Sequence, residues 1–319
     1  LSSAQVAAID AADVPALATA AVASLATSAF AAMTSDQIVA LTVAQAGALT
    51  TAHLDNITTE QLAAMQSDDL RALGTAELRA LDSDQIDALT SAQVAALTNA
   101  QFASLSSVQL AGLDTEAIAA LTAGQVGVLG TAQAAALTSD QLGALVTANM
   151  GSISTNALRA LSVGALAGLS TDQVLALTQN QVTALTTAQV AALSTDQVAT
   201  LETAELAALS LAQVAALDSD QIDALTTAHV AALTTAQLAS LSSVQLPGLD
   251  SEAIAALSSA QVAAFTTAQV DVLSTEQLAA IDTADMHALT TQQLRALDSA
   301  QVDALSSDQV AALTPTQFA

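Results

Sequence analysis

Apolar residues recur at two fixed positions of an eight-residue repeat that runs along the chain. From Ser3 to Thr314 the sequence divides into 39 octads without an insertion or deletion, and partial units stand before and after them. When octad positions are numbered p1 to p8 from Ser3, p4 is always apolar and p7 is almost always Leu. Two apolar residues three apart share one face of a helix but lie on opposite faces of a strand. The pattern therefore predicts helices with p4 and p7 in the core.

A polar pair marks the start of each predicted helix. Position p8 is usually Thr, Ser or Asp and p3 is usually Gln, as in Thr186 with Gln189. In this spacing, the capping box, the p8 side chain accepts from the p3 N–H and the p3 side chain accepts from the p8 N–H. Each octad should therefore start its own helix. Pro15 and Pro247, both at p5, predict distorted or 3₁₀ geometry in their octads.

One long helix is excluded because the apolar pair would rotate by about 80° with every octad and would form no straight seam. A helix of fewer than two turns is unstable alone, so neighbouring octads must bury its apolar face, as in a solenoid. We expect an all-α solenoid with one very short helix per octad and two octads per coil, forming a thin rod or filament. Three octads per coil is the alternative. Residues 1–319 should form a single continuous solenoid, a segment of a longer array.

Longer identities lie over the octads. The segment DSDQIDALT at 82–90 recurs at 218–226, which is 17 octads later, and the octads that follow remain similar. Growth by duplication of whole blocks suits a protein selected for length.

The charge of the chain bears on its partners. It has 30 acidic residues, four Arg and no Lys or Cys, and its net charge is −26. Such a surface repels nucleic acid and anionic lipid and attracts divalent cations. Because no run of about 18 apolar residues is present, we expect no membrane insertion.

Calcium is the candidate ligand because it prefers clusters of oxygen atoms. Under a coil of two octads, Asp282 would stack on Asp298 and Asp68 on Asp84. The alternative is that Asp at p8 caps helices and acidic residues at p2 interact with the helix dipole, so that no cofactor is required. The candidate calcium ligands are Asp82, Asp84, Asp87, Asp218, Asp220, Asp223, Asp282 and Asp298.

Other side chains suggest structural roles. The p3 Gln residues would form a column along the solenoid, in which either an amide ladder forms or each Gln only caps its helix. His53 and His229 take the Gln position in two octads. The chain has no Cys or Lys nucleophile, no Gly-rich phosphate loop and no pair of His at metal spacing, so we expect no enzymatic activity.

The unbroken S/T-x-Q-V/L-x-A-L-S/T octads of this acidic, Lys-free and Cys-free chain resemble the low-complexity repeat regions of very large secreted bacterial adhesin and matrix proteins. The resemblance implies export, assembly into a surface fibre or stalk and calcium-dependent folding. We also expect self-association along or between fibres. We therefore expect an extracellular structural fibre that provides length and stiffness at a bacterial surface or in a biofilm matrix. The alternatives are a calcium-responsive spacer that folds on export, and a binding module whose repetitive surface recognises glycan, ice or mineral.

Overall fold

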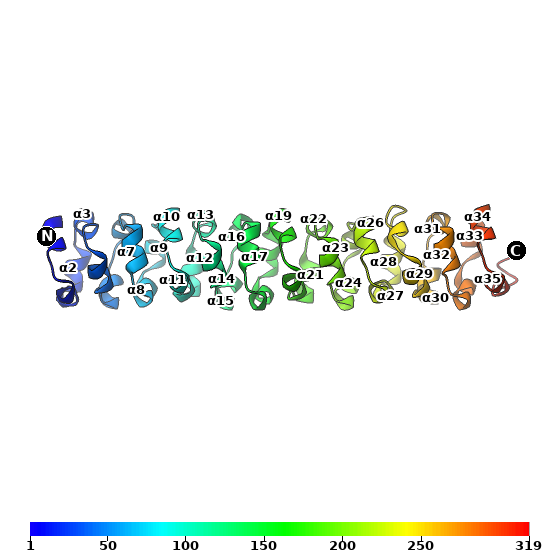
Figure 1. Cartoon of the computed structure of the whole chain (residues 1–319), viewed down its shortest axis with the longest axis horizontal. Coiled ribbons are helices and arrows are strands. Elements are labelled where there is room, and N and C mark those ends of the chain that lie inside the picture. Colours follow the sequence, from blue (N-terminus) through cyan, green and yellow to red (C-terminus); the bar gives the residue numbers. More distant parts are fainter. Residues whose placement is uncertain (319) are drawn as a thin grey trace. The chain divides into compact units, whose positions relative to one another are not determined.

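The computed structural model describes residues 1–318, in which each octad forms one short helix and no strand is present (Figure 1). The α-helices have four to six residues, and four further elements, η1 to η4, are 3₁₀-helices. The all-α solenoid with one helix per octad is therefore confirmed. The chain divides into two compact units, Leu1–Leu169 (unit 1) and the part from Ser170 onward (unit 2), and each is described by itself. The single continuous solenoid stays a prediction.

Unit 1 contains α1 (Ser3–Ala7), η1 (Ala11–Ala16), α2 (Thr19–Ala23), α3 (Thr27–Phe30), α4 (Ser35–Val39), α5 (Val43–Ala46), α6 (Thr51–Leu54), α7 (Thr59–Ala64), α8 (Ser67–Ala72), α9 (Thr75–Arg79), α10 (Ser83–Asp87), α11 (Ser91–Ala96), α12 (Asn99–Ser104), α13 (Ser107–Ala111), α14 (Thr115–Ala119), α15 (Ala123–Gly127), α16 (Thr131–Ala136), α17 (Ser139–Ala144), η2 (Thr147–Ser152), α18 (Thr155–Ala160) and α19 (Val163–Ala167).

Unit 2 contains α20 (Thr171–Leu175), α21 (Gln179–Ala184), α22 (Thr187–Ala191), α23 (Thr195–Ala199), α24 (Thr203–Ala208), α25 (Leu211–Val214), α26 (Ser219–Asp223), α27 (Thr227–Ala232), α28 (Thr235–Ser240), η3 (Leu246–Gly248), α29 (Ser251–Ala255), α30 (Ser259–Ala263), α31 (Thr267–Asp271), α32 (Thr275–Ala279), η4 (Thr283–Ala288), α33 (Thr291–Arg295), α34 (Ser299–Asp303) and α35 (Ser307–Ala311).

The predicted capping box starts most of these helices. At α22 the Thr186 hydroxyl accepts from the Gln189 N–H at 3.2 Å, and Gln189 Oε1 accepts from the Thr186 N–H at 2.8 Å. The N-cap residue is extended, so the previous helix cannot continue through it. At the other end, the Leu193 N–H at p7 donates to the Val190 carbonyl at p4 over 3.2 Å, which closes the last turn.

The core consists of the p4 and p7 side chains, as predicted. Every p4 residue from Val6 to Met286 is buried, and so is every p7 residue from Met33 to Leu289. Because these positions repeat without interruption, each unit has one continuous apolar interior rather than a separate core for each helix.

The number of octads per coil differs from the expectation. Helices pack on helices three octads away, as α10 does on α13, and the p3 side chains described below bond to the octad four before. A coil therefore has between three and four octads, and two octads per coil is wrong. In Figure 1, α10 and α13 lie along the upper edge of unit 1 and α8 and α11 along its lower edge.

Two groups of octads depart from α-helical geometry. Elements η1, η2 and η4 begin at intervals of 17 octads and carry the short side chains Asp13, Asn149 and Asp285 at p3, where the octad normally has Gln. A short p3 side chain does not by itself impose 3₁₀ geometry, because α8 with Asp69 and α14 with Ala117 at this position are α-helices. Pro15 lies in η1 and Pro247 in η3, which confirms the predicted distortion at p5.

The buried core gives the first prediction. Leu238 is fully buried at p4, whereas Leu175 at p5 is 50% exposed. We expect Leu238→Ala to lower the free energy of unfolding by about 2–5 kcal/mol, because it removes buried contacts and leaves a cavity, and Leu175→Ala to change it by less than about 0.5 kcal/mol. Urea unfolding followed by circular dichroism measures both. Equal losses in the two variants would contradict the assignment of p4 to the core.

Candidate functional site

The p3 glutamine is the polar side chain that ties the coils together. In octad 91–98, Gln93 is 3% exposed, and its Oε1 accepts from the Thr90 N–H at 2.8 Å. Its Nε2 donates to the carbonyls of Leu62 at 3.0 Å and Met65 at 2.7 Å. Both carbonyls belong to the octad four before. One amide thus caps its own helix and holds the adjacent coil, and we call this arrangement the glutamine hook.

The hook repeats in both units. Each hook donates through Nε2 to the p7 carbonyl of the octad four before it, as Gln93 does to Met65. It is made by Gln37, Gln45, Gln61, Gln85, Gln93, Gln101, Gln109, Gln125, Gln133 and Gln141 in unit 1, and by Gln213, Gln221, Gln237, Gln245, Gln261, Gln269, Gln277, Gln293, Gln301, Gln309 and Gln317 in unit 2.

These bonds decide between the two interpretations of the glutamine column. The amide donors go to backbone carbonyls and not to the next amide, so the amide ladder is wrong at these positions. Capping is confirmed, but it uses only the oxygen of the side chain. A buried amide without partners costs several kcal/mol, and a hydrogen-bonded one contributes about 1 kcal/mol net. The hooks therefore fix which octads become neighbours more than they add to total stability.

His53 and His229 reproduce the hook with a ring. Nδ1 of His53 accepts from the Thr50 N–H at 3.2 Å, so Nε2 carries the proton and donates to the Leu25 carbonyl at 2.9 Å. His229 makes the same pair of contacts with Thr226 and Leu201. Both rings are buried, and both are neutral in this arrangement because Nδ1 must act as an acceptor. Histidine is therefore a structural substitute for glutamine here.

Two buried acids occupy hook positions, and they lie 17 octads apart. The Oε2 of Glu205 accepts from the Glu202 N–H at 2.9 Å, as a hook oxygen does, and burial raises the pKa of this carboxyl. Asp69 is 2% exposed, and its Oδ2 has no hydrogen-bond partner. Burial and then the charge of Asp68 raise the pKa of Asp69 to about 6. The signal for these residues was an acid at p3, which the sequence analysis did not single out.

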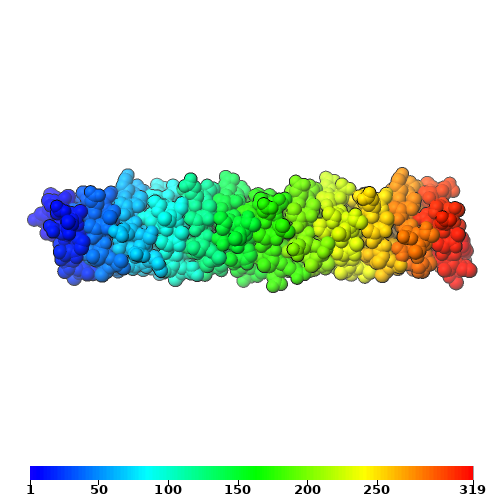
Figure 2. Space-filling model, turned by 60° about the horizontal axis from the view of Figure 1, so that its bottom comes forward, coloured from blue at the N-terminus to red at the C-terminus, as the bar shows by residue number. Residues whose placement is uncertain are grey.

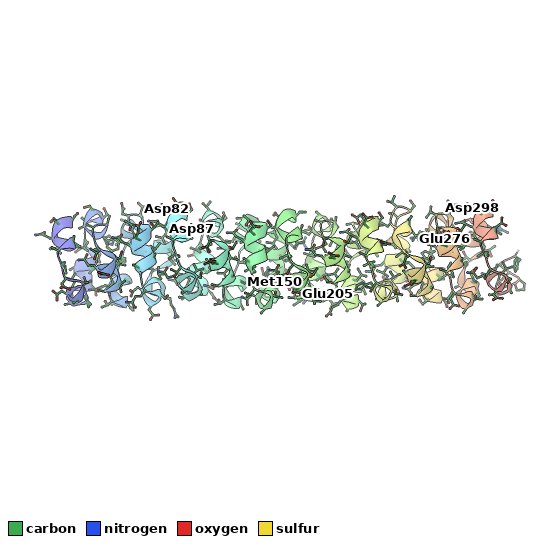
Figure 3. All side chains as sticks on the ribbon, in the orientation of Figure 1. Asp82, Asp87, Met150, Glu205, Glu276 and Asp298 are labelled. Carbon is green, nitrogen blue, oxygen red and sulfur yellow. The ribbon has the colours of Figure 1, made fainter. Side chains whose placement is uncertain are left out.

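The predicted calcium ligands have mainly capping geometry. Asp82, Asp218 and Asp298 accept from the p3 N–H of α10, α26 and α34 at 2.7–2.8 Å, and Asp282 accepts from the Ala284 N–H of η4 at 2.9 Å. Asp84, Asp87, Asp220 and Asp223 are located on α10 and α26, and Figure 3 shows Asp82 and Asp87 on the same edge of unit 1.

The stacking behind the calcium assignment is not found. Asp68 and Asp84, like Asp282 and Asp298, are two octads apart, whereas helices of adjacent coils pack at three octads and the hooks join octads four apart. Within residues 1–318, no group of three or more His, Asp or Glu side chains is placed to hold a metal ion. Calcium ligation by these residues stays a prediction, and helix capping is what the structure shows for four of them.

The surface, one face of which is drawn in Figure 2, has open depressions. One of about 440 Å³ lies beside Pro247 and Val272, and its ionisable side chain, Asp250, caps α29 by accepting from the Ala253 N–H at 2.7 Å. None of the helices described is both long enough and apolar enough to cross a bilayer.

The hook yields a prediction with a matched control on one helix. Gln293 on α33 is a buried hook, while its neighbour Gln292 is exposed. We expect Gln293→Leu to lower the free energy of unfolding by about 2–4 kcal/mol, because it leaves a buried N–H and a buried carbonyl without partners. Gln292→Leu should change it by less than about 0.5 kcal/mol. Hydrogen exchange of the Thr290 amide and urea unfolding provide the readouts; equal protection in both variants would contradict the hook.

The buried acid yields a pH prediction. Since the pKa of Asp69 is raised in the folded state, folding favours the protonated form, and stability falls as pH rises from about 4 to about 6. Asp69→Gln supplies the missing hook and should raise the free energy of unfolding by about 2 kcal/mol at pH 7.5. The gain should shrink toward pH 4. Asp140→Asn, an exposed change at p2, is the control; a gain that is independent of pH would refute the explanation.

Comparison with known proteins agrees with the repeat. The model of the ALTTAQ repeat matches residues 6–43, 62–99, 150–187, 198–235, 249–280 and 278–315. No curated protein matches the chain. The matched segments together cover more than half of the sequence, and the octads that they contain are among those whose helices and hooks are described above. The chain therefore belongs to the ALTTAQ repeat family.

Proposed function

We propose that this protein is a structural extracellular fibre or adhesin stalk, which provides length and stiffness at a bacterial surface or in a biofilm matrix. The observation that carries the proposal is the glutamine hook, which joins each coil to the previous one by the same contacts in both units. Because each added octad contains its own capping residue, its own p4 and p7 core residues and its own hook, the solenoid can be lengthened by adding octads of the same pattern.

The distribution of variable positions supports a mechanical role. The residues at p3, p4 and p7 are mostly buried and nearly constant in character, whereas p1, p2 and p5 are mostly exposed and vary. This distribution indicates selection on the buried residues that hold the coils of the solenoid together. Four Arg and no Lys also leave few sites for trypsin-like proteases, which suits a protein outside the cell.

A second candidate is a calcium-responsive spacer that folds on export. Carboxylates on helices that pack together favour it: Asp36 on α4, Glu60 on α7 and Asp84 on α10 lie on three helices in contact. A divalent cation would reduce the repulsion among such charges. In this candidate the ion is part of the folding mechanism, whereas in the first one the hooks and the core suffice.

One experiment tests both candidates. We expect the purified chain to give a helical circular dichroism spectrum and thin rods in negative-stain images, with calcium and equally after chelation with EDTA, because the hooks need no metal. Loss of the helical signal in EDTA that returns with calcium would replace the first candidate by the second. A coil spectrum in both conditions would contradict the solenoid function altogether.

A further inference from the structure

Acidic residues at p2 follow the period of the coil. Successive acidic p2 residues are three or four octads apart. Asp68 is the one acidic p2 residue outside this series. The series consists of Asp36, Glu60, Asp84, Glu116 and Asp140 in unit 1, and of Asp172, Asp196, Asp220, Glu252, Glu276 and Asp308 in unit 2.

Helices of this series that are three octads apart pack on each other in successive coils. In unit 1, α4 packs on α7, α7 on α10, and α14 on α17. In unit 2, α20 packs on α23, α23 on α26, and α29 on α32, while the hook of Gln309 joins α35 to the octad of α32 through the Leu278 and Ile281 carbonyls. We call these helices together the acidic edge.

Further acids strengthen the acidic edge. Its helices have acidic N-caps at Asp82, Asp114, Asp218 and Asp250 and acidic p5 residues at Asp87 and Asp223. With the 11 acidic p2 residues, this edge carries 17 of the chain's 30 acidic residues and none of its four Arg.

Another side of each unit is almost without charge. In unit 1, α2 packs on α5, and α9 packs on α12, which packs on α15. In unit 2, α25 packs on α28 and α28 on α30, and the hooks of Gln213 and Gln293 add α21 and α33. We call these helices the neutral face. They and their N-caps hold three ionisable residues, Glu77, Arg79 and Arg295.

Unit 2 shows that the two sides stay separate over several coils. From α20 to α35 the acidic series takes five steps, and Asp172 and Asp308 are 17 octads apart. Counted as one coil for each step, the five steps over 17 octads give 3.4 octads per coil, which lies between the three octads of the helix contacts and the four octads of the hooks. The distance from Asp172 to Asp308 equals the length of the duplicated block, which is also 17 octads.

The separation of acidic and uncharged helices is informative because a fibre surrounded only by solvent could have its charges on any side. With a net charge of −26, two copies repel each other unless they approach through the sides of lowest charge. Charges on other helices of the coil are roughly a helix diameter of 10–12 Å away or more, beyond the Debye length of about 8 Å in physiological salt.

We propose that the neutral face is the surface on which a second copy of this chain packs side by side, with the acidic edges turned toward solvent. This deepens the proposed fibre function and rests on it. The contact would involve small side chains such as Ala100 on α12 and Ala236 on α28, both exposed at p2, with Val43 and Leu211 as the larger exposed apolar groups.

The test compares two double variants that add the same charge at the same octad position. Ala100→Glu with Ala236→Glu lies on the neutral face, and Ala92→Glu with Ala228→Glu lies on α11 and α27, outside it. All four alanines are exposed. We expect the wild-type chain to dimerise in sedimentation equilibrium, the first variant to bind at least about tenfold more weakly, and the second to stay within about twofold of wild type.

Cysteine cross-linking gives an independent readout because the chain has no Cys. Ala100→Cys should form a disulfide-linked dimer under mild oxidation, and Asp140→Cys on the acidic edge should not. A wild-type chain that stays monomeric, or equal weakening by both charge variants, would overturn the pairing. If helical rods persist in that case, the fibre function stands without it; loss of the helical spectrum in the wild type would instead refute the proposed function.

Discussion

The structure depends on satisfying the buried amides that join one coil to the next. A side chain at p3 points into the stack, where it meets the N–H that starts its own helix and carbonyls at the end of a helix in the adjacent coil. Water does not reach these groups, so an unpaired member would cost more than a hydrogen bond returns. Glutamine has an acceptor and a donor at the distances required. The apolar pair at p4 and p7 stabilises the stack, but apolar contacts alone would permit one coil to shift by an octad against the next. The hook determines which octads of adjacent coils are neighbours.

The exceptions at p3 show what the hook requires. Histidine replaces glutamine because a neutral imidazole has one acceptor and one donor on opposite sides of the ring. Asn149 keeps the donor to the coil carbonyl of Leu121 but is too short to cap, and its octad is a 3₁₀-helix. Glu205 keeps the cap but offers a second oxygen in place of the donor, and burial favours its protonated form. The contacts of Asn149 and the protonation of Glu205 thus both reflect the acceptor and the donor that the p3 position requires.

The parts of this fold that the sequence predicts are those set within one octad. The capping box, the helix in each octad, the p4 and p7 core and the distortion at Pro15 and Pro247 all follow from contacts inside an octad or at its ends. Two octads per coil failed because coil size is decided by partners four octads away, such as the Leu62 and Met65 carbonyls of Gln93. The sequence did not reveal these partners four octads away, so the glutamine column was interpreted as helix caps or as an amide ladder. The candidate calcium residues inherited the wrong coil, so the predicted stacks of Asp68 on Asp84 and of Asp282 on Asp298 have no counterpart.

A coil of 3.4 octads has a further consequence, because no octad lies directly above the one three or four places before it. Charges placed in every third octad, or in every fourth octad, would therefore drift around the solenoid. The sequence alternates the two intervals, and in unit 2 the steps from Asp172 to Asp308 are three, three, four, three and four octads. Each p3 amide bonds to carbonyls of the octad four before its own, whereas helices pack on helices three octads away. The sequence therefore contains two periodic patterns. The interior residues repeat with a period of one octad, whereas the surface charges repeat with a longer, non-integral period. The second pattern becomes apparent only in the folded structure.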